Sequence, residues 1–133
     1  MPTTGAFTDY LENALINHIL RNTAYTTPGL NVWVGLFTAD PTDTGSLASE
    51  VSGNNYGRVQ ATFSAPSNGV TSNSGALTFP TASGSWSTVS WFGIMDAQTS
   101  GNMLFRGQLD VAKAVAINDT VKFNAGDLQV TLD

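Results

Sequence analysis

The sequence predicts a mainly β protein, an antiparallel β-sandwich or jelly-roll-like domain preceded by one N-terminal α-helix. From Asn31 onward, short apolar segments alternate with clusters of Gly, Asn, Asp, Ser and Pro, which favour turns. Helical spacing of apolar residues is confined to the first part of the chain. The 133 residues are 41% hydrophobic and suffice for one packed core. We therefore expect a single domain, with an N-terminal arm at 1–7, the helix at 8–22 and the β-sandwich at 30–133.

The helix is predicted by its start signals and by its apolar spacing. Thr8 or Asp9 is a suitable N-cap, and Glu12 follows Asp9 at the spacing of a capping box. Additional apolar residues widen the stripe, so the helix has surface to bury on more than one side. The main stripe comprises Phe7, Leu11, Ala14, Leu15, His18 and Ile19, and the widening residues are Tyr10, Ile16 and Leu20.

The strands are predicted from short runs of β-branched and aromatic residues between turn clusters. Many short strands at close spacing are typical of a sandwich or jelly roll. The expected strands are Asn31–Phe37, Tyr56–Phe63, Gly75–Phe79, Val89–Met95, Met103–Leu109, Ala112–Ile117, Thr120–Phe123 and Leu128–Leu132.

The strand WFGIM, within Val89–Met95, is apolar on both faces. Alternation places Phe92 and Ile94 on one face and the remaining three residues, Trp91 among them, on the other. A two-sheet sandwich covers only the inner face, so the helix or another subunit is expected to cover the outer one. In the returning strand, Met103, Phe105 and Leu109 are expected to share a face.

The chain offers little catalytic chemistry. Asp96, with Arg106 beyond it, could belong to a small hydrolase, but turn formation alone explains an Asp at this place. The only histidine, His18, lies in the apolar stripe and is interpreted as a packed or interface residue. No nucleophile elbow, P-loop or zinc motif is present. We therefore expect no enzyme activity and no catalytic, cofactor-binding or metal-binding residues.

The segment DPTDTG, from Asp40 to Gly45, resembles a calcium loop only loosely. It lacks the regular alternation of acids and the distal glutamate, which favours an ordinary turn. A weak calcium site formed by Asp40, Asp43 and Glu50 is the alternative.

Three aromatic residues are candidate glycan contacts, because exposed rings can stack on sugars: Tyr56, Trp86 and Trp91. The alternative is that Trp33 and Trp91 are core residues and that Trp86 is partly exposed after a Gly-Ser turn.

The low content of charged residues limits the kinds of partner that the chain can be expected to bind. Charged residues make up 11% of the chain, against about 25% in typical globular domains. The net charge is −5 and the five Lys and Arg are scattered singly, so direct contact with nucleic acid is not expected. With no Cys, the chain has no disulfide framework and no thiolate zinc site. Its apolar runs are far shorter than the ~20 residues of a membrane span, and its first residues do not form a secretory signal.

The order of several segments resembles a family of small bacteriophage structural proteins. These segments are FTDYLENALINHILRNTAYTTP, VWVGLFTADPTDTG, the stretch from Glu50 to Leu109 that begins EVSGNNYGRVQ, and AGDLQVTLD. The resemblance runs from Phe7 to Asp133, and members are commonly labelled phage tail fibre or virion structural proteins. It implies a non-enzymatic virion protein with no active residue to carry over.

The short, non-repetitive chain differs from a fibre shaft and suits a compact subunit added in many copies, as in phage head-decoration (cement) proteins. By that analogy we expect an oligomeric capsid decoration protein made in the host cytoplasm, a homotrimer on the particle exterior. Its partners would be the major capsid protein or other virion proteins. The alternative is a tail-fibre or tail-tip domain that binds host glycans. The contact surface is expected at the N-terminal arm and the helix, at Phe7, Tyr10, Asn17 and His18.

Overall fold

The computed structural model describes residues 3–29 and 31–132, and of residues 3–5 it describes the backbone. A sheet of seven strands, in the order β3-β2-β6-β7-β1-β9-β4, is joined by a two-stranded sheet of β5 and β8. The mainly β fold class, with antiparallel sheets and one helix near the N-terminus, is confirmed. The elements are β1 (Thr3–Phe7), α1 (Asp9–Leu20), β2 (Val32–Phe37), β3 (Val59–Ala61), β4 (Val70–Ser72), β5 (Leu77–Thr78), β6 (Ser87–Met95), β7 (Met103–Val115), β8 (Lys122–Phe123) and β9 (Leu128–Thr131).

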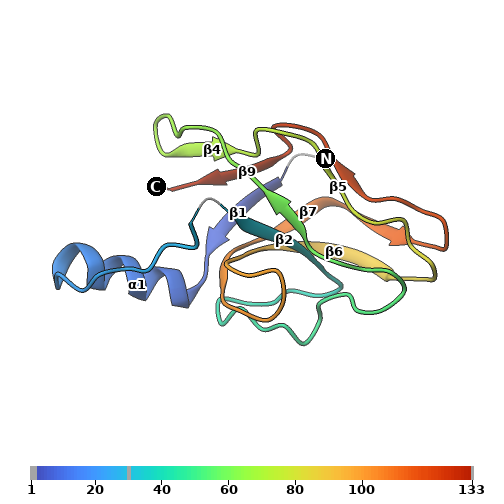
Figure 1. Ribbon diagram of the computed structural model, residues 1–133, viewed down its shortest axis with the longest axis horizontal. Helices are drawn as coiled ribbons and strands as arrows, with labels where there is room; N and C mark the ends of the chain where they lie inside the picture. Colours follow the sequence, from blue (N-terminus) through green and yellow to red (C-terminus); the bar gives the residue numbers. More distant parts are fainter. Residues whose placement is uncertain (1–2, 30, 133) are drawn as a thin grey trace.

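Strand β1 joins two layers of the large sheet. Its first half pairs in parallel with β9, from Thr3 against Leu128 to Gly5 against Val130, and its second half pairs antiparallel with β7. Beyond β1, strands β9 and β4 form the upper layer in Figure 1. The main core contains Leu128 and Val130 from β9 together with side chains of β2 and β6, so the two layers pack on each other. The β1–β9 pair is a parallel element in a sheet expected to be antiparallel.

Three features differ from the expected elements. The segment expected to be an N-terminal arm contains β1, which fills the sheet between β7 and β9. Strand β7 runs unbroken from Met103 to Val115, where two strands were expected. Strand β4, at Val70–Ser72, falls in a segment expected to be a loop. The pairing of β1 is with residues about a hundred positions away, so local patterning gives no sign of it.

The apolar strand WFGIM in β6 is covered on both faces by its own chain. Phe92 and Ile94 belong to the main core between the layers. On the other face, Met95 packs with Phe37 in a second, smaller cluster, and Leu47 of the long β2–β3 loop packs against it. This loop supplies a cover that was expected from the helix or from another subunit.

A bulge in the β6–β7 hairpin changes which residues share a face. The register shifts next to Met95, which pairs with Met103 and leaves Leu104 as an extra residue. Met103 therefore joins the second cluster, whereas Phe105 and Leu109 face the main core. The expectation that these three residues share a face is wrong, because the bulge interrupts the alternation.

Helix α1 projects from the body of the protein and occupies the left side of Figure 1. It contacts β7 and β1, and Leu11 is its one fully buried residue. The chain after the helix runs back along it toward β2. Helix and returning chain therefore form a protrusion on one side of a β body.

Candidate functional site: the projecting helix

The base of α1 is fixed to the β-sheet through Thr8. This residue is the N-cap by position, but its hydroxyl makes no cap hydrogen bond. The hydroxyl donates instead to the carbonyl of Met103 at 2.5 Å. The carbonyl of Leu104 is a second, more distant acceptor, 3.2 Å from the same hydroxyl oxygen. The Thr8 amide also donates to the Leu104 carbonyl, at 3.0 Å. Thr8 is fully buried, so the bulge in β7 and the start of the helix are joined by one threonine.

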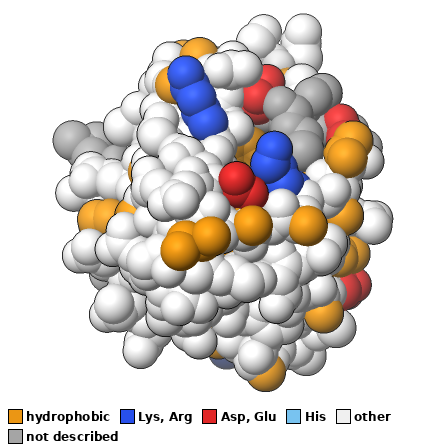
Figure 2. All heavy atoms as spheres, turned by 90° about the vertical axis from the view of Figure 1, so that its right-hand side faces the viewer, with side chains coloured by type: hydrophobic (Ala, Val, Ile, Leu, Met, Phe, Trp, Pro, Cys, Tyr) orange, Lys and Arg blue, Asp and Glu red, His pale blue; other side chains and the backbone are white. Residues whose placement is uncertain are grey.

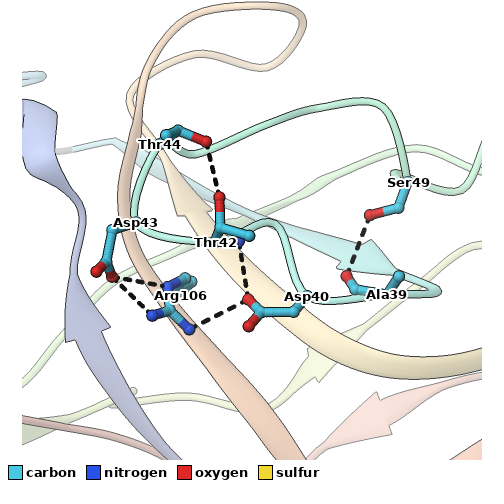
Figure 3. Close-up of polar contacts among 7 residues, drawn as sticks. All are labelled: Ala39, Asp40, Thr42, Asp43, Thr44, Ser49 and Arg106. Carbon is cyan, nitrogen blue, oxygen red and sulfur yellow. Dashed lines mark hydrogen bonds and ion pairs between the residues drawn. The ribbon is translucent and has the colours of Figure 1, made fainter.

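A second attachment links the helix base to the β2–β3 loop. The Asp9 amide donates to the Asp43 carbonyl at 2.8 Å. The Asp43 carboxylate accepts hydrogen bonds from Nη2 and Nε of Arg106, at 2.6 and 3.2 Å, and Arg106 also bonds Asp40 at 3.2 Å (Figure 3). The guanidinium lies 5.4 Å from the ring centroid of Trp91. Arg106 is thus paired with these loop acids, which hold the loop beside the start of α1.

Helix α1 carries the main apolar exposure among the described residues. Within the described chain, seven large hydrophobic residues are exposed, and four of them lie on this one helix. They are Tyr10 at 41%, Ile16 at 54%, Ile19 at 72% and Leu20 at 77% exposed. An isolated 12-residue helix is marginal in water, and most helical stability comes from packing of an apolar face. The described chain leaves much of this face unpacked.

The side of the molecule away from the helix looks different. Figure 2 shows it dominated by uncharged polar side chains and backbone, with hydrophobic side chains in a thin row and in isolated spots. Singly exposed apolar residues are normal, whereas concentrated ones indicate an interaction surface. The helix is therefore the strongest candidate for a contact surface.

The four residues expected at the interface lie in different settings. Tyr10 and His18 are exposed on α1, while Phe7 is half-buried with its ring 4.6 Å from that of Phe105. Asn17 is half-buried, and its carbonyl accepts the amides of Arg21 and Thr23, both at 3.1 Å, which ends the helix. The more exposed residues are Ile16, Ile19 and Leu20. The sequence marked Ile16 and Leu20 by their position outside the main stripe, whereas Ile19 lies in that stripe and carried no such mark.

A polar cluster around Arg58 fixes the body of the protein. The guanidinium binds both carboxylate oxygens of Glu50, at 2.7 and 2.8 Å, and donates to the carbonyls of Ala97 and Ser100, both at 2.8 Å. Arg58 is 8% exposed, and the Glu50 hydrogen bonds raise its pKa despite burial. The cluster joins the β2–β3 loop to the β6–β7 turn, a role that no local pattern around Arg58 indicates.

Tyr56 belongs to the same cluster. Its hydroxyl donates to Glu50 at 2.8 Å and accepts the Leu36 amide at 3.0 Å. Burial, followed by the charge of Glu50, raises the pKa of Tyr56 well above its usual value. Its ring meets that of Trp86 edge to face, 5.4 Å between centroids.

The three candidate glycan aromatics do not form a stacking platform. Trp86 is 3% exposed in the main core, and its indole Nε1 donates to the Asn54 carbonyl. The expectation that Trp86 is partly exposed is therefore wrong. Tyr56 packs on Trp86, whereas half-buried Trp91 belongs to the cluster on the other face of β6. The fold does not bring these rings together on one surface.

The acidic residues considered for catalysis or calcium are engaged separately. Both carboxylate oxygens of Asp96 accept hydrogen bonds from Asn102, at 2.7 Å from the amide and 3.1 Å from the side chain, as a turn residue would. Glu50 binds Arg58, while Asp40 and Asp43 bind Arg106. In residues 3–29 and 31–132, no three acidic or histidine side chains gather as a metal site would require.

Comparison with known proteins finds a family whose model matches most of the chain. A family model described as podophage GP4 fiber I protein gp80 matches residues 6–131. No curated protein matches the chain. No helix in the described part of the chain has the length and hydropathy needed to cross a membrane.

Proposed function

The chain belongs to the podophage GP4 fiber I protein gp80 family, and from that membership we propose that it is a homo-oligomeric subunit of a phage fibre on the particle exterior. The family identifies a phage structural protein and a virion component. The finer assignment, to a fibre that is assembled by contacts between copies of this chain, is our proposal. We put the fibre first because the family description names one. The capsid decoration role expected from the sequence is the second candidate.

The observation that carries the proposal is the projecting, apolar helix α1. Its base is fixed by Thr8 and Asp9, while Ile16, Ile19 and Leu20 extend into solvent. A rigid base with an apolar outer part suits a subunit that docks into an assembly. Closed rotational symmetry is the usual form of such assemblies, and a homotrimer remains our expectation. Repeated contacts would multiply a modest individual affinity.

The position on the particle separates the two candidates. Gold-labelled antibody against the chain, imaged on purified virions, should mark the tail end, and a stained gel should give a low copy number. Label spread over the head, with hundreds of copies per particle, would instead support capsid decoration. Absence of the chain from purified virions would contradict both.

Self-association is tested separately on the purified chain. Light scattering after size exclusion should give an oligomer for the wild type and a lower mass for Ile16→Asn combined with Ile19→Asn. Val111→Asn combined with Ile117→Asn is the matched control, because these residues are similarly exposed (66% and 60%) but lie outside α1. A wild-type monomer throughout the micromolar range would contradict a self-assembling subunit.

A further inference from the structure

An apolar groove lies between the two layers of the sheet, beside the start of α1. It consists of two adjoining hollows of about 220 and 380 Å³ that share Thr71, Phe105 and Val130. Phe63 lines the first, while Phe7 and Leu132 line the second.

The groove is open and uncharged. Leu132 is 54% exposed, and the rings of Phe7, Phe63 and Phe105 are only half-buried. None of the described residues that line the two hollows carries a charge. An apolar side chain that entered would therefore strand no buried ion, which is the main penalty for covering such a surface.

We propose that this groove receives the outer part of helix α1 from a second copy of the chain. The helix supplies Ile16 together with Ile19 and Leu20, which follow Ile16 by three and four residues and so share one apolar face with it. An amphipathic helix in an apolar groove is a recurrent mode of protein recognition. This inference rests on the self-association proposed above and specifies its two surfaces.

The chain's own helix is held away from this groove. Phe7 lines the groove and Thr8, the next residue, is bonded to Met103 and Leu104, so the direction of α1 is set where it leaves the sheet. The helix then extends outward from the body (Figure 1). The occupant must accordingly come from elsewhere, and a second copy brings a helix of matching chemistry at equal concentration.

The available area favours a reciprocal or cyclic exchange. The four exposed apolar residues of α1 are far fewer than the roughly 20–30 residues that each partner contributes to a standard interface. If each copy both inserts its helix and receives another, helix and groove are buried together on every chain. Each chain then buries two surfaces instead of one, which favours a stable association.

The experiment uses two variants of the full chain, each with one surface damaged. The helix variant is Ile19→Glu with Leu20→Glu, and the groove variant is Pro66→Glu with Leu132→Glu. All four residues are exposed, so both variants should keep the circular dichroism spectrum of the wild type. Each alone should be monomeric by analytical ultracentrifugation. An equimolar mixture should recover a dimer, at a higher concentration than the wild type needs to associate, since the intact groove of one can receive the intact helix of the other but only one such contact forms.

Four other outcomes would overturn the inference. A groove variant that keeps the wild-type mass would exclude the groove but leave self-association through α1 standing. If both variants are monomeric and their mixture stays monomeric, helix–helix packing would explain the data, and the groove would again be excluded. A groove variant that unfolds at lower temperature with unchanged mass would mean that the chain's own residues fill the groove. A monomeric wild type would remove both proposals.

Discussion

The β body and the projecting helix differ in which side chains they bury and which they expose. In the body, even an arginine is enclosed: Arg58 is 8% exposed, and all of its described hydrogen bonds are internal. On the helix, large apolar residues such as Leu20 are 77% exposed. Substitutions in the body should therefore change the free energy of unfolding, whereas those on the outer helix should change association.

The largest effect is expected at Arg58. Arg58→Met removes the bidentate partner of Glu50 and leaves a largely buried carboxylate, whose uncompensated charge costs about 3–5 kcal/mol of unfolding free energy. Urea denaturation measures this loss. The double variant Arg58→Met with Glu50→Gln should recover part of it, because no lone charge remains. Equal losses in the single and double variants would contradict the ion-pair explanation.

The second-largest loss of unfolding free energy is expected at Thr8, which connects the β body to the helix. Thr8→Val removes the hydroxyl that donates to the Met103 carbonyl, which costs roughly 1–3 kcal/mol for an unsatisfied buried group. Thr8→Ser keeps the hydroxyl and is the control, with a smaller loss from its missing methyl group. If Thr8→Val and Thr8→Ser were equally destabilising, the contacts of the Thr8 methyl group rather than its hydrogen bond would fix the helix base.

Alkaline pH should weaken the body through Tyr56. Burial and the Glu50 charge raise its folded-state pKa above the usual 10.0. Above pH 10 the unfolded chain therefore releases this proton while the folded chain retains it, and stability falls as pH rises. The contribution approaches about 1.4 kcal/mol per pH unit. Urea midpoints from pH 9 upward should fall less steeply in Tyr56→Phe than in the wild type; equal slopes would contradict the assignment.

Arg106 should matter less than Arg58, although it also binds two oxygens. Its side chain is 18% exposed, and that of Asp43 is 59% exposed. Exposed ion pairs contribute about 0.2–1 kcal/mol, and a cation over an aromatic ring adds about 0.5–1 kcal/mol. We expect Arg106→Gln to cost about 1 kcal/mol, and less in high salt. A salt-independent loss as large as that of Arg58→Met would show that exposure does not distinguish the two arginines.

The same contrast explains which parts of the molecule were predictable from the sequence. The helix and strands β2 and β6 carry local patterns, so their positions were predicted closely. Strand β1 has no such pattern, since its pairing depends on β7 and β9 at the far end of the chain. The β7 bulge moved Met103 to the other face, and no local feature indicates it. Exposure of the outer helix depends on where Thr8 directs it, which only the folded structure determines.

The smallest effect on stability is expected where the effect on association is largest. Ile19 is 72% exposed, so Ile19→Gln should change the unfolding free energy of the monomer by no more than about 0.5 kcal/mol. Leu11, on the same helix but 5% exposed, is the matched control, and Leu11→Ala should cost about 2–5 kcal/mol. Denaturation at high dilution measures both, because association adds a concentration-dependent term to stability. A large loss at Ile19 under dilution would mean that the outer helix packs within its own chain, and the division between an enclosed body and an apolar docking helix would fail.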